Sequence, residues 1–375
     1  MGIRAESGLL ALKQLGLLDN ALQASTVGAN GADKAPTFWS SDWKTMFDPS
    51  SFAMFNEFED GMPKSGIRLV RYVLRDMLLN ALSVGTEVHW GNGCQTTRIL
   101  PDGRTQIELS NGSTDEADLL VAADGSNSKV RTMLLPEEKL EYTGAVCFLG
   151  TSRFPDGKPE LLAHKWGMNI SGKGVPFLTL YVLFNLGCLR NSLLIMCSPV
   201  DSHTGVWGIS YRPEKPRNRI KGKEAMERRD EILDEVRTRG KMFHEPFNQF
   251  IDATDPETLQ VFNAMHKYPL SHAQKLSHAK IALIGDANHP MSPFSGNGAN
   301  MALMDGVSLA KQLAGHESVR TAIEEFDKES MPRSRKAIDK SKWVIPILHS
   351  EGLTYWLLRT LFAVLSSVLW VKSLW

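Results

Sequence analysis

The sequence predicts a mixed α/β fold with two parts, an open α/β domain and a domain built on an antiparallel sheet. Short apolar runs at 118–123 and 280–284 each end at an Asp/Gly pair ahead of a helical pattern, which is typical of parallel strands. Residues 146–211 contain several β-type runs separated by Gly, Pro, Asn and Asp, which is typical of an antiparallel sheet. The length of 375 residues is enough for two domains.

The composition is that of an ordinary globular protein, with 42% hydrophobic and 22% charged residues. Because 42 basic residues balance 42 acidic ones, we expect no nucleic-acid partner. The four cysteines form no CxxC pair, and no apolar stretch follows a basic one at the N-terminus. Both observations favour a cytoplasmic location. No cluster of His, Asp and Glu has metal-ligand spacing, so no metal is expected.

Helical and strand periods alternate along the chain. Leucines at helical spacing predict the first helix, and Gly16 suits its end. Turn signals at 101–103 and 111–112 separate short strands. In chain order we expect a helix within 2–24, short strands and loops over 37–59, an amphipathic helix over 66–82, short strands over 86–121, strands at 177–186, 192–197 and 206–211, a charged helix at 225–236, a buried strand at 280–284 and a helix over 299–314.

Residues 353–375 are strongly apolar and aromatic. Arg359 and Lys372 bracket an uncharged run at 360–371. As a helix this run spans about 18 Å, less than the roughly 30 Å of a bilayer core. We expect a packed terminal helix, and membrane contact, as an interfacial anchor or a span, remains an open alternative.

The strongest chemical signal lies at 280–300. The strand there delivers Asp286 to the edge of the parallel sheet, where ligands bind in open α/β sheets, and its carboxylate can accept two hydrogen bonds from hydroxyls. Pro293 stiffens the turn, while Gly296 and Gly298 let a flat ligand approach the backbone. The helix that follows points its N–H groups and positive dipole end at that ligand.

A second motif follows the strand at 118–123. Asp124 and Gly125 predict a tight turn, and Ser126 or Ser128 can cap the helix that carries Arg131. A capped turn without a ligand is the structural alternative for this motif.

Together these motifs resemble those of the single-component FAD-dependent aromatic hydroxylases, the p-hydroxybenzoate hydroxylase-like family, over about residues 2–340. The resemblance implies a Rossmann-like FAD-binding domain with an antiparallel-sheet substrate domain. It also implies that Asp286 binds the ribityl hydroxyls of FAD. The residues that it places along the isoalloxazine are Pro293, Gly296, Gly298, Ala299 and Asn300.

Further matches to the family are less extensive. Asp124, Gly125 and Arg131 match a fingerprint that the family uses for FAD and NAD(P)H. Arg71 matches an arginine that reaches the FAD, although an ordinary surface position competes with this reading. The segment 326–333 resembles a C-terminal signature but carries Ser330 where an arginine is usual.

No catalytic residue is assigned from the sequence. His289 lies inside the flavin motif, and a structural hydrogen bond is the preferred interpretation over acid–base work. The implied domains are 1–142, the first part of the FAD-binding domain; 143–270, the antiparallel-sheet substrate domain; 271–342, the flavin motif and its helix; and 343–375, the apolar C-terminal helical segment.

The family normally opens with a strand, a Gly-x-Gly-x-x-Gly turn, a helix and a second strand. This sequence begins with residues that resemble the segment after that unit, so we expect the first βαβ unit to be missing. The gene product is then truncated, or it binds FAD poorly, or another chain completes it. The sequence does not choose among these.

The resemblance implies a monooxygenase. NAD(P)H reduces the flavin, which then uses O2 to insert one oxygen atom into an organic substrate. The candidates for its lining suggest a lipophilic or aromatic ligand, although plain core is at least as plausible for each: Trp166, Phe177, Tyr181 and Phe184. Similar enzymes with apolar C-terminal segments occur in secondary-metabolite pathways, so the resemblance implies a secondary-metabolite substrate. The alternative function is a degenerate, non-catalytic flavoprotein or binding protein.

Overall fold

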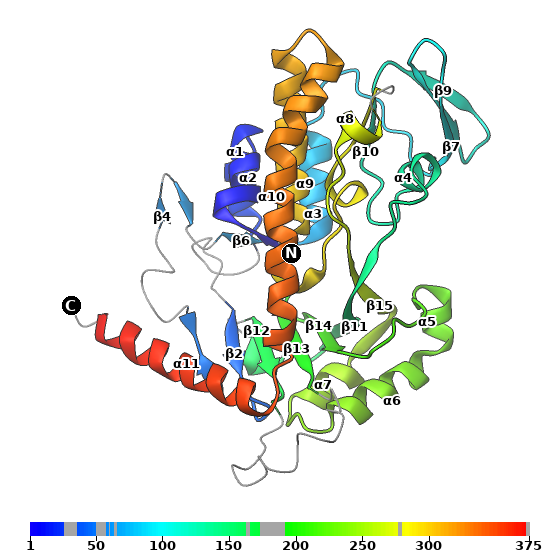
Figure 1. The fold of residues 1–375 in the computed structure, drawn as a ribbon. Helices are drawn as coiled ribbons and strands as arrows, with labels where there is room; N and C mark the ends of the chain where they lie inside the picture. Colours follow the sequence, from blue (N-terminus) through cyan, green and yellow to red (C-terminus); the bar gives the residue numbers. More distant parts are fainter. Residues whose placement is uncertain are drawn as a thin grey trace. The chain divides into compact units, whose positions relative to one another are not determined.

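The structure, a computed structural model, describes residues 1–25, 36–49, 58–59, 61–63, 66–162, 166–172, 192–276 and 280–372 (Figure 1). The chain forms two compact units. Unit 1 comprises residues 1–24, 69–141 and 265–342, and unit 2 comprises residues 25–68, 142–264 and 343–375. Each unit is therefore assembled from three separate stretches of the chain.

Unit 1 contains the parallel pair that the sequence predicted. Strand β10 (Leu120–Ala122) pairs in parallel with β16 (Ile281–Leu283), and every residue of β16 is buried. In the described part of the chain this parallel sheet has two strands. A separate antiparallel sheet of β7 (Cys94–Ile99), β8 (Thr105–Leu109) and β9 (Thr114–Ala117) turns at the two predicted turn sequences.

Helices surround these strands. Helix α3 begins later than the sequence predicted, because Val70 is extended, with φ −71° and ψ 138°, and the helix starts only at Arg71. The helical elements of unit 1 are a π-helical turn η1 (Ala5–Leu9), α1 (Leu10–Gln14), α2 (Leu18–Gln23), α3 (Arg71–Asn80), α4 (Lys129–Leu134), α8 (His272–Lys275), α9 (Gly298–Gly315) and α10 (Val319–Leu348), whose last residues belong to unit 2.

Unit 2 is built on a seven-stranded sheet in the order β15-β11-β14-β13-β12-β2-β3. The sheet is antiparallel except that β12 pairs with β2 in parallel, so the predicted antiparallel sheet is in fact mixed at one edge. Its strands are β2 (Thr37–Trp39), β3 (Thr45–Phe47), β11 (Glu141–Arg153), β12 (Gly167–Ile170), β13 (Leu194–Pro199), β14 (Thr204–Tyr211) and β15 (Thr254–His266). The mixed α/β fold class is confirmed.

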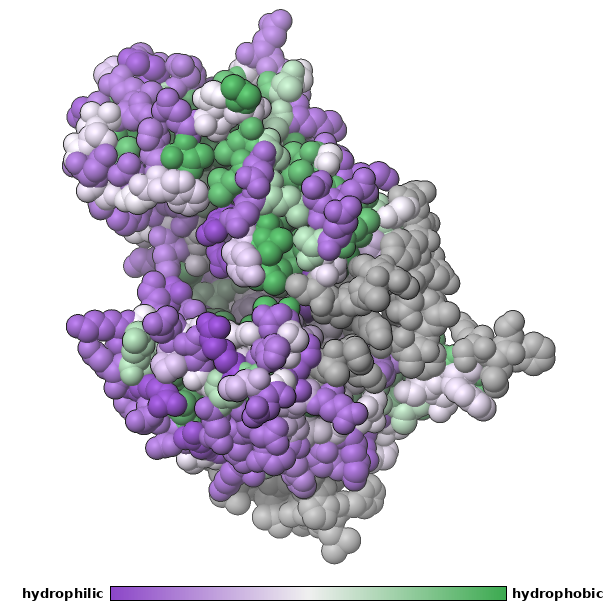
Figure 2. Space-filling view, turned by 180° about the vertical axis from the view of Figure 1, so that it is seen from behind, coloured by the Kyte–Doolittle hydropathy of each residue, from purple (hydrophilic) through white to green (hydrophobic). Residues whose placement is uncertain are grey.

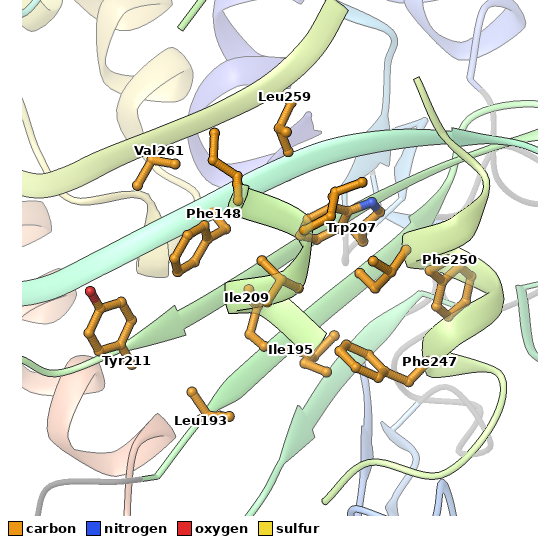
Figure 3. Packing of buried hydrophobic residues seen from close by; sticks show 14 of the residues in the cluster. Phe148, Leu193, Ile195, Trp207, Ile209, Tyr211, Phe247, Phe250, Leu259 and Val261 are labelled. Carbon is orange, nitrogen blue, oxygen red and sulfur yellow. The ribbon is translucent and has the colours of Figure 1, made fainter. Parts of the chain in front are cut away.

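One face of this sheet forms the core of unit 2. Trp207 and Ile209 lie on it, and α7 (Phe247–Asp252) packs Phe247 and Phe250 against the same cluster (Figure 3). These side chains are almost fully buried. Because aromatic side chains bury a large apolar area, this layer is the main source of cohesion in the unit.

The predicted charged helix forms as two helices, α5 (Lys223–Glu227) and α6 (Arg229–Gly240). Arg228 separates them because its ψ of 17° departs from helical geometry. Apolar residues such as Ile232 and Val236 face the core. The charged residues form the strongly hydrophilic surface at the lower left of Figure 2.

The predicted terminal helix is α11 (Gly352–Lys372). It packs within unit 2 along a narrow stripe, where Phe362 stacks on Phe47 at 5.3 Å between ring centroids and contacts Phe38 at 5.0 Å. Most other apolar side chains of α11 are exposed, Trp356 and Trp370 among them. By length and composition alone, residues 352–371 are long and apolar enough to cross a membrane.

The compact units differ from the domain ranges that the sequence suggested. Residues 25–68 and 343–375 belong to the unit of the large sheet, because β2 and β3 extend that sheet and α11 packs on β3. The predicted strand at 177–186, with Phe177, Tyr181 and Phe184, lies outside the described residues.

Candidate functional site

The turn after β16 is the centre of the candidate site. Gly285 begins it with φ +56°, and an added Cβ would lie 2.9 Å from the Cβ of Ala302. A side chain at this position would therefore be both strained and crowded. The turn places Asp286 next to the N-terminus of α9 and buries His289 completely.

Asp286 is half-buried, and in the described part of the chain no donor bonds to its carboxylate. Burial raises the pKa of Asp286, while the charges of His289, Arg71 and Arg131 oppose that rise. A carboxylate that is partly desolvated and unpaired is suited to accept hydrogen bonds from a ligand's hydroxyls.

The start of α9 leaves room beside this carboxylate. Pro293 begins a short 3-10 turn that ends at Gly296, which has φ +63°. An added Cβ on Gly298 would lie 3.6 Å from Asp286 Oδ1, and Ala299 is half-buried on the next position. The first N–H groups of a helix have no acceptor in their own turn, so they can face a ligand here.

Asn300 differs from the other residues predicted along the isoalloxazine, because its side-chain amide is buried and already hydrogen-bonded within the protein. Its Nδ2 donates to Gly2 O at 3.0 Å and to Gly296 O at 3.2 Å, and its Oδ1 accepts from Arg4 N at 2.8 Å. Gly8 must be glycine beside it, since a Cβ there would lie 2.4 Å from Asn300 Oδ1. Asn300 thus holds the N-terminal segment against the turn.

The Asp-Gly motif caps α4. Asp124 Oδ2 accepts from Lys129 N at 2.8 Å, and Gly125 takes φ +82° in the turn. Ser128 caps the helix by accepting from Arg131 N at 3.0 Å. The predicted serine cap is confirmed, and Asp124 uses its carboxylate on the backbone of the helix.

Arg131 joins the two motifs. Its Nη1 donates to Ala287 O at 2.5 Å, and its Nη2 donates to Ser126 O at 2.5 Å. The guanidinium is buried, so these bonds fix the Asp-Gly turn to the Asp286 turn. Arg71, by contrast, lies exposed at the first position of α3 and reaches Asp286 through its charge.

The residues around Asp286 fit the polar edge of a flavin. Buried polar atoms in the described residues that have no partner there include His289 Nδ1, Ser295 Oγ and Asn297 Oδ1. Buried polar groups normally have partners. The same turn has bare glycines at Gly296 and Gly298, so a flat group rich in acceptors and donors can lie against it.

Unit 2 carries a second candidate surface on the sheet face opposite its core. Leu149, Gly208, Met196, Met168 and Phe38 are directly paired from strand to strand across β11, β14, β13, β12 and β2. All five are only partly buried. Gly208 adds no side chain to this row, and Leu149 Cδ1 and Met196 Cε lie 3.5 Å and 3.9 Å from where its Cβ would be.

Trp166 was a candidate for the substrate lining. In the structure Arg68 lies over its ring, with the guanidinium carbon 4.2 Å from the centroid. This stacking occupies one face of the indole, which makes Trp166 less suited to contact a substrate than the paired row.

The comparisons with known proteins identify the family of this chain. A family model described as an FAD binding domain matches residues 11–341. The monooxygenase cfoF of Aspergillus candidus is 36% identical over 361 residues, which cover 94% of this chain and 79% of the relative. The FAD-dependent monooxygenase aptC of Emericella nidulans is 26% identical over 305 residues, which cover 76% of this chain and 70% of the relative.

Solved structures share the fold. The structure of Klebsiella pneumoniae HpxO complexed with FAD and uric acid has a TM-score of 0.69 at 18% identity, covering 100% of this chain and 86% of that one. A salicylate hydroxylase substrate complex has a TM-score of 0.65 at 18% identity, covering 93% and 80%. At this identity the likeness shows the fold.

This chain belongs to the family of FAD-dependent, aromatic hydroxylase-like monooxygenases that share this FAD binding domain. It is an enzyme of the oxidoreductase class, and FAD is its cofactor. The resemblance seen in the two sequence motifs is thereby confirmed. The comparisons give no support to the alternative of membrane contact through α11.

Proposed function

We propose that the turn around Asp286 holds the ribityl and isoalloxazine parts of FAD, and that the enzyme uses NAD(P)H and O2 to oxygenate a lipophilic or aromatic secondary metabolite. The observation that carries the proposal is the unpaired, half-buried Asp286 carboxylate beside the open backbone of Gly298. Hydroxyl groups of a ribityl chain are suitable donors for such a carboxylate.

The predicted site residues divide into two groups under this proposal. Asp286, Pro293, Gly296, Gly298 and Ala299 contact the flavin. The remaining predicted residues position those contacts or adjust the charge near them: Arg71, Asp124, Gly125, Arg131 and Asn300. The bound FAD supplies hydride acceptance and oxygen activation, and the protein supplies orientation, exclusion of water and electrostatics.

The paired row in unit 2 supports an apolar substrate. Its side chains are apolar and partly exposed, and Met168 and Met196 can adapt to irregular ligand shapes. The fungal relatives are themselves named FAD-dependent monooxygenases, which fits a chain that oxygenates small organic molecules. We place the substrate against this row.

The first test combines cofactor and turnover. The purified chain is incubated with FAD, gel-filtered and examined for the visible flavin absorbance band, then assayed for NADPH and NADH oxidation with naphthols and anthrones of graded size. We expect bound flavin and substrate-dependent oxidation, with label from isotopic O2 in the product. Bound flavin without any substrate-dependent oxidation would instead favour the non-catalytic flavoprotein.

Gly208 gives a matched pair of variants for the substrate surface. Gly208→Leu places a bulky side chain in the row, so we expect KM for the larger substrates to rise about tenfold or more, with FAD content unchanged. Gly208→Ala adds a Cβ at ordinary contact distance, 3.5 Å from Leu149 Cδ1, and should behave like the wild type. Equal kinetics for both variants would show that the substrate does not bind against this row.

A further inference from the structure

Asp305 lies in the middle of α9 and is 0% exposed. Its Oδ2 accepts from Gly285 N at 2.9 Å and from His289 Nε2 at 2.5 Å. Its Oδ1 accepts from Ser330 Oγ at 2.8 Å and from Arg333 Nη2 at 2.9 Å. One buried carboxylate therefore has four donors.

This arrangement keeps the carboxylate ionised. Burial raises the pKa of Asp305, but hydrogen bonds from His289, Gly285 and Ser330 lower it by more, so it lies below its ordinary value. A buried charge is costly unless it is paired and hydrogen-bonded. Arg333 supplies the opposite charge and the other donors complete the shell.

The four donors come from two places. Gly285 and His289 belong to the turn that carries Asp286, whereas Ser330 and Arg333 belong to α10. Asp305 therefore connects the turn to two helices at once. Without its carboxylate, the Gly285 N–H would be buried next to α9 without its acceptor, which is costly.

The carboxylate also fixes His289. An ionised carboxylate can only accept, so His289 Nε2 carries the proton in their bond. The other ring nitrogen, Nδ1, is buried without a partner in the described residues. His289 therefore lies between the two carboxylates: it bonds to Asp305, and its charge lowers the pKa of Asp286.

We propose that Asp305 is a positioning residue for FAD: it sets the conformation of the Gly285–His289 turn, and thereby the orientation of Asp286 toward the ribityl chain. The inference rests on the proposed function of Asp286 and extends it to a side chain that touches no ligand. It also assigns a role to Ser330, the position at which the sequence departs from the family signature.

The unit contains a matched control. Asp327, 5% exposed, bonds to His272 Nδ1 at 2.6 Å and accepts from His272 N at 2.7 Å. This second buried Asp–His pair makes no hydrogen bond to residues 285–289 that the structure describes. Asp327→Asn should therefore lower stability as Asp305→Asn does, without acting on the flavin turn.

The experiment compares the wild type, Asp305→Asn and Asp327→Asn in FAD titrations across pH and in hydrogen–deuterium exchange of the apo protein. We expect Asp305→Asn to raise the Kd for FAD about ten- to hundredfold at neutral pH and to speed exchange in the peptide spanning 284–290. Asp327→Asn should leave the Kd within about threefold, because it removes no bond to the turn.

The pH profile separates positioning from plain destabilisation. Because the folded pKa of Asp305 is lowered, its contribution is complete above its ordinary pKa and is lost as pH falls through the folded value. Wild-type affinity should therefore fall toward that of Asp305→Asn in acid. A ratio between the two that stays constant as the pH falls well below about 4, the ordinary pKa of an Asp, would contradict the proposal.

The two measurements separate a failure of this inference from a failure of the proposed function. If neither the wild type nor Asp305→Asn binds FAD, the proposed function fails. Faster exchange at 284–290 that is confined to Asp305→Asn would still support the positioning role. Unchanged affinity and unchanged exchange in a folded Asp305→Asn overturn the inference. Should that variant not fold, Ser330→Ala removes one donor to the buried charge and is expected to raise the Kd about tenfold, beyond the threefold allowed for Asp327→Asn.

Discussion

At the scale of single residues, the polar side chains around the site in unit 1 have two different roles. Arg131, Asn300 and Asp305 form hydrogen bonds to other protein groups, and these bonds hold the loops around the site. Asp286 has none from the described residues and is left for a ligand. This difference in bonding, more than residue type, is why we propose that Asp286 meets the cofactor.

His349 gives a prediction for pH. Its Nδ1 donates to Ile345 O at 2.8 Å, and its Nε2 accepts from Ser210 Oγ at 2.9 Å, so the buried ring is held neutral. Burial lowers its pKa to about 4. The unfolded chain binds the proton more readily, so stability falls as pH drops from about 6.5 to about 4.

The expected loss from this one group is about 2 kcal/mol between pH 7 and pH 5. Urea unfolding at both pH values measures it, and His349→Asn, which cannot titrate, should lose correspondingly less over the same range. If the variant and the wild type lose equal stability, His349 does not titrate as its surroundings imply.

The arrangement of the candidate site residues was predictable only where local sequence determines it. Asp286, Gly296 and Gly298 follow one another in a single strand-turn-helix unit, so their order in the sequence indicates their arrangement. Arg4 and Gly8 contact Asn300 across nearly the whole chain. No local pattern predicts such a contact, since it depends on how distant segments pack.

At the scale of elements, α11 shows how a mostly apolar helix is attached by few residues. Tyr355 and Phe362 are its buried anchors, and they lie on one side of the helix, seven residues apart. The remaining apolar surface contributes little to that attachment because it is exposed. Unit 2 therefore depends on a narrow contact for its last helix.

Phe362→Ala should detach this helix. Removing a buried aromatic ring costs about 3–4 kcal/mol, and the ring contacts with Phe38 and Phe47 are lost as well. Val364→Ala, on the exposed side of the same helix, should cost less than about 0.5 kcal/mol. Thermal unfolding and limited proteolysis near residue 352 measure both, and a similar loss for the two variants would rule out the narrow contact.

Strand and helix positions were predicted best where the apolar residues recur at a clear helical or strand spacing. The buried strand at 281–283 and helix α9 form close to their expected places. Strand β15 was not predicted because its polar residues obscure the alternation. The parallel pairing of β2 with β12 could not be predicted either, because pairing direction between distant strands is a property of the assembled sheet.

At the scale of the whole molecule, the fold class follows from sequence but the division into units does not. The two apolar strands indicate the open α/β domain, and the β-rich middle of the chain indicates the antiparallel-sheet domain. The grouping of residues 25–68 with the large sheet depends on edge strands of three residues each, which are too short to carry a pattern. Function was predictable because the flavin motif is both local and chemically specific.

The dispersal of each unit over three stretches also bears on how the protein is made. The turn that holds Asp286 depends on α10, which supplies Ser330 and Arg333 to Asp305, and α10 is synthesised after the turn. The flavin turn therefore emerges from the ribosome before its support, and its apolar surroundings need protection meanwhile. Ribosome-stalled chains should gain protease resistance in unit 1 only when they extend beyond α10, and resistance in chains that end before residue 319 would contradict this order of assembly.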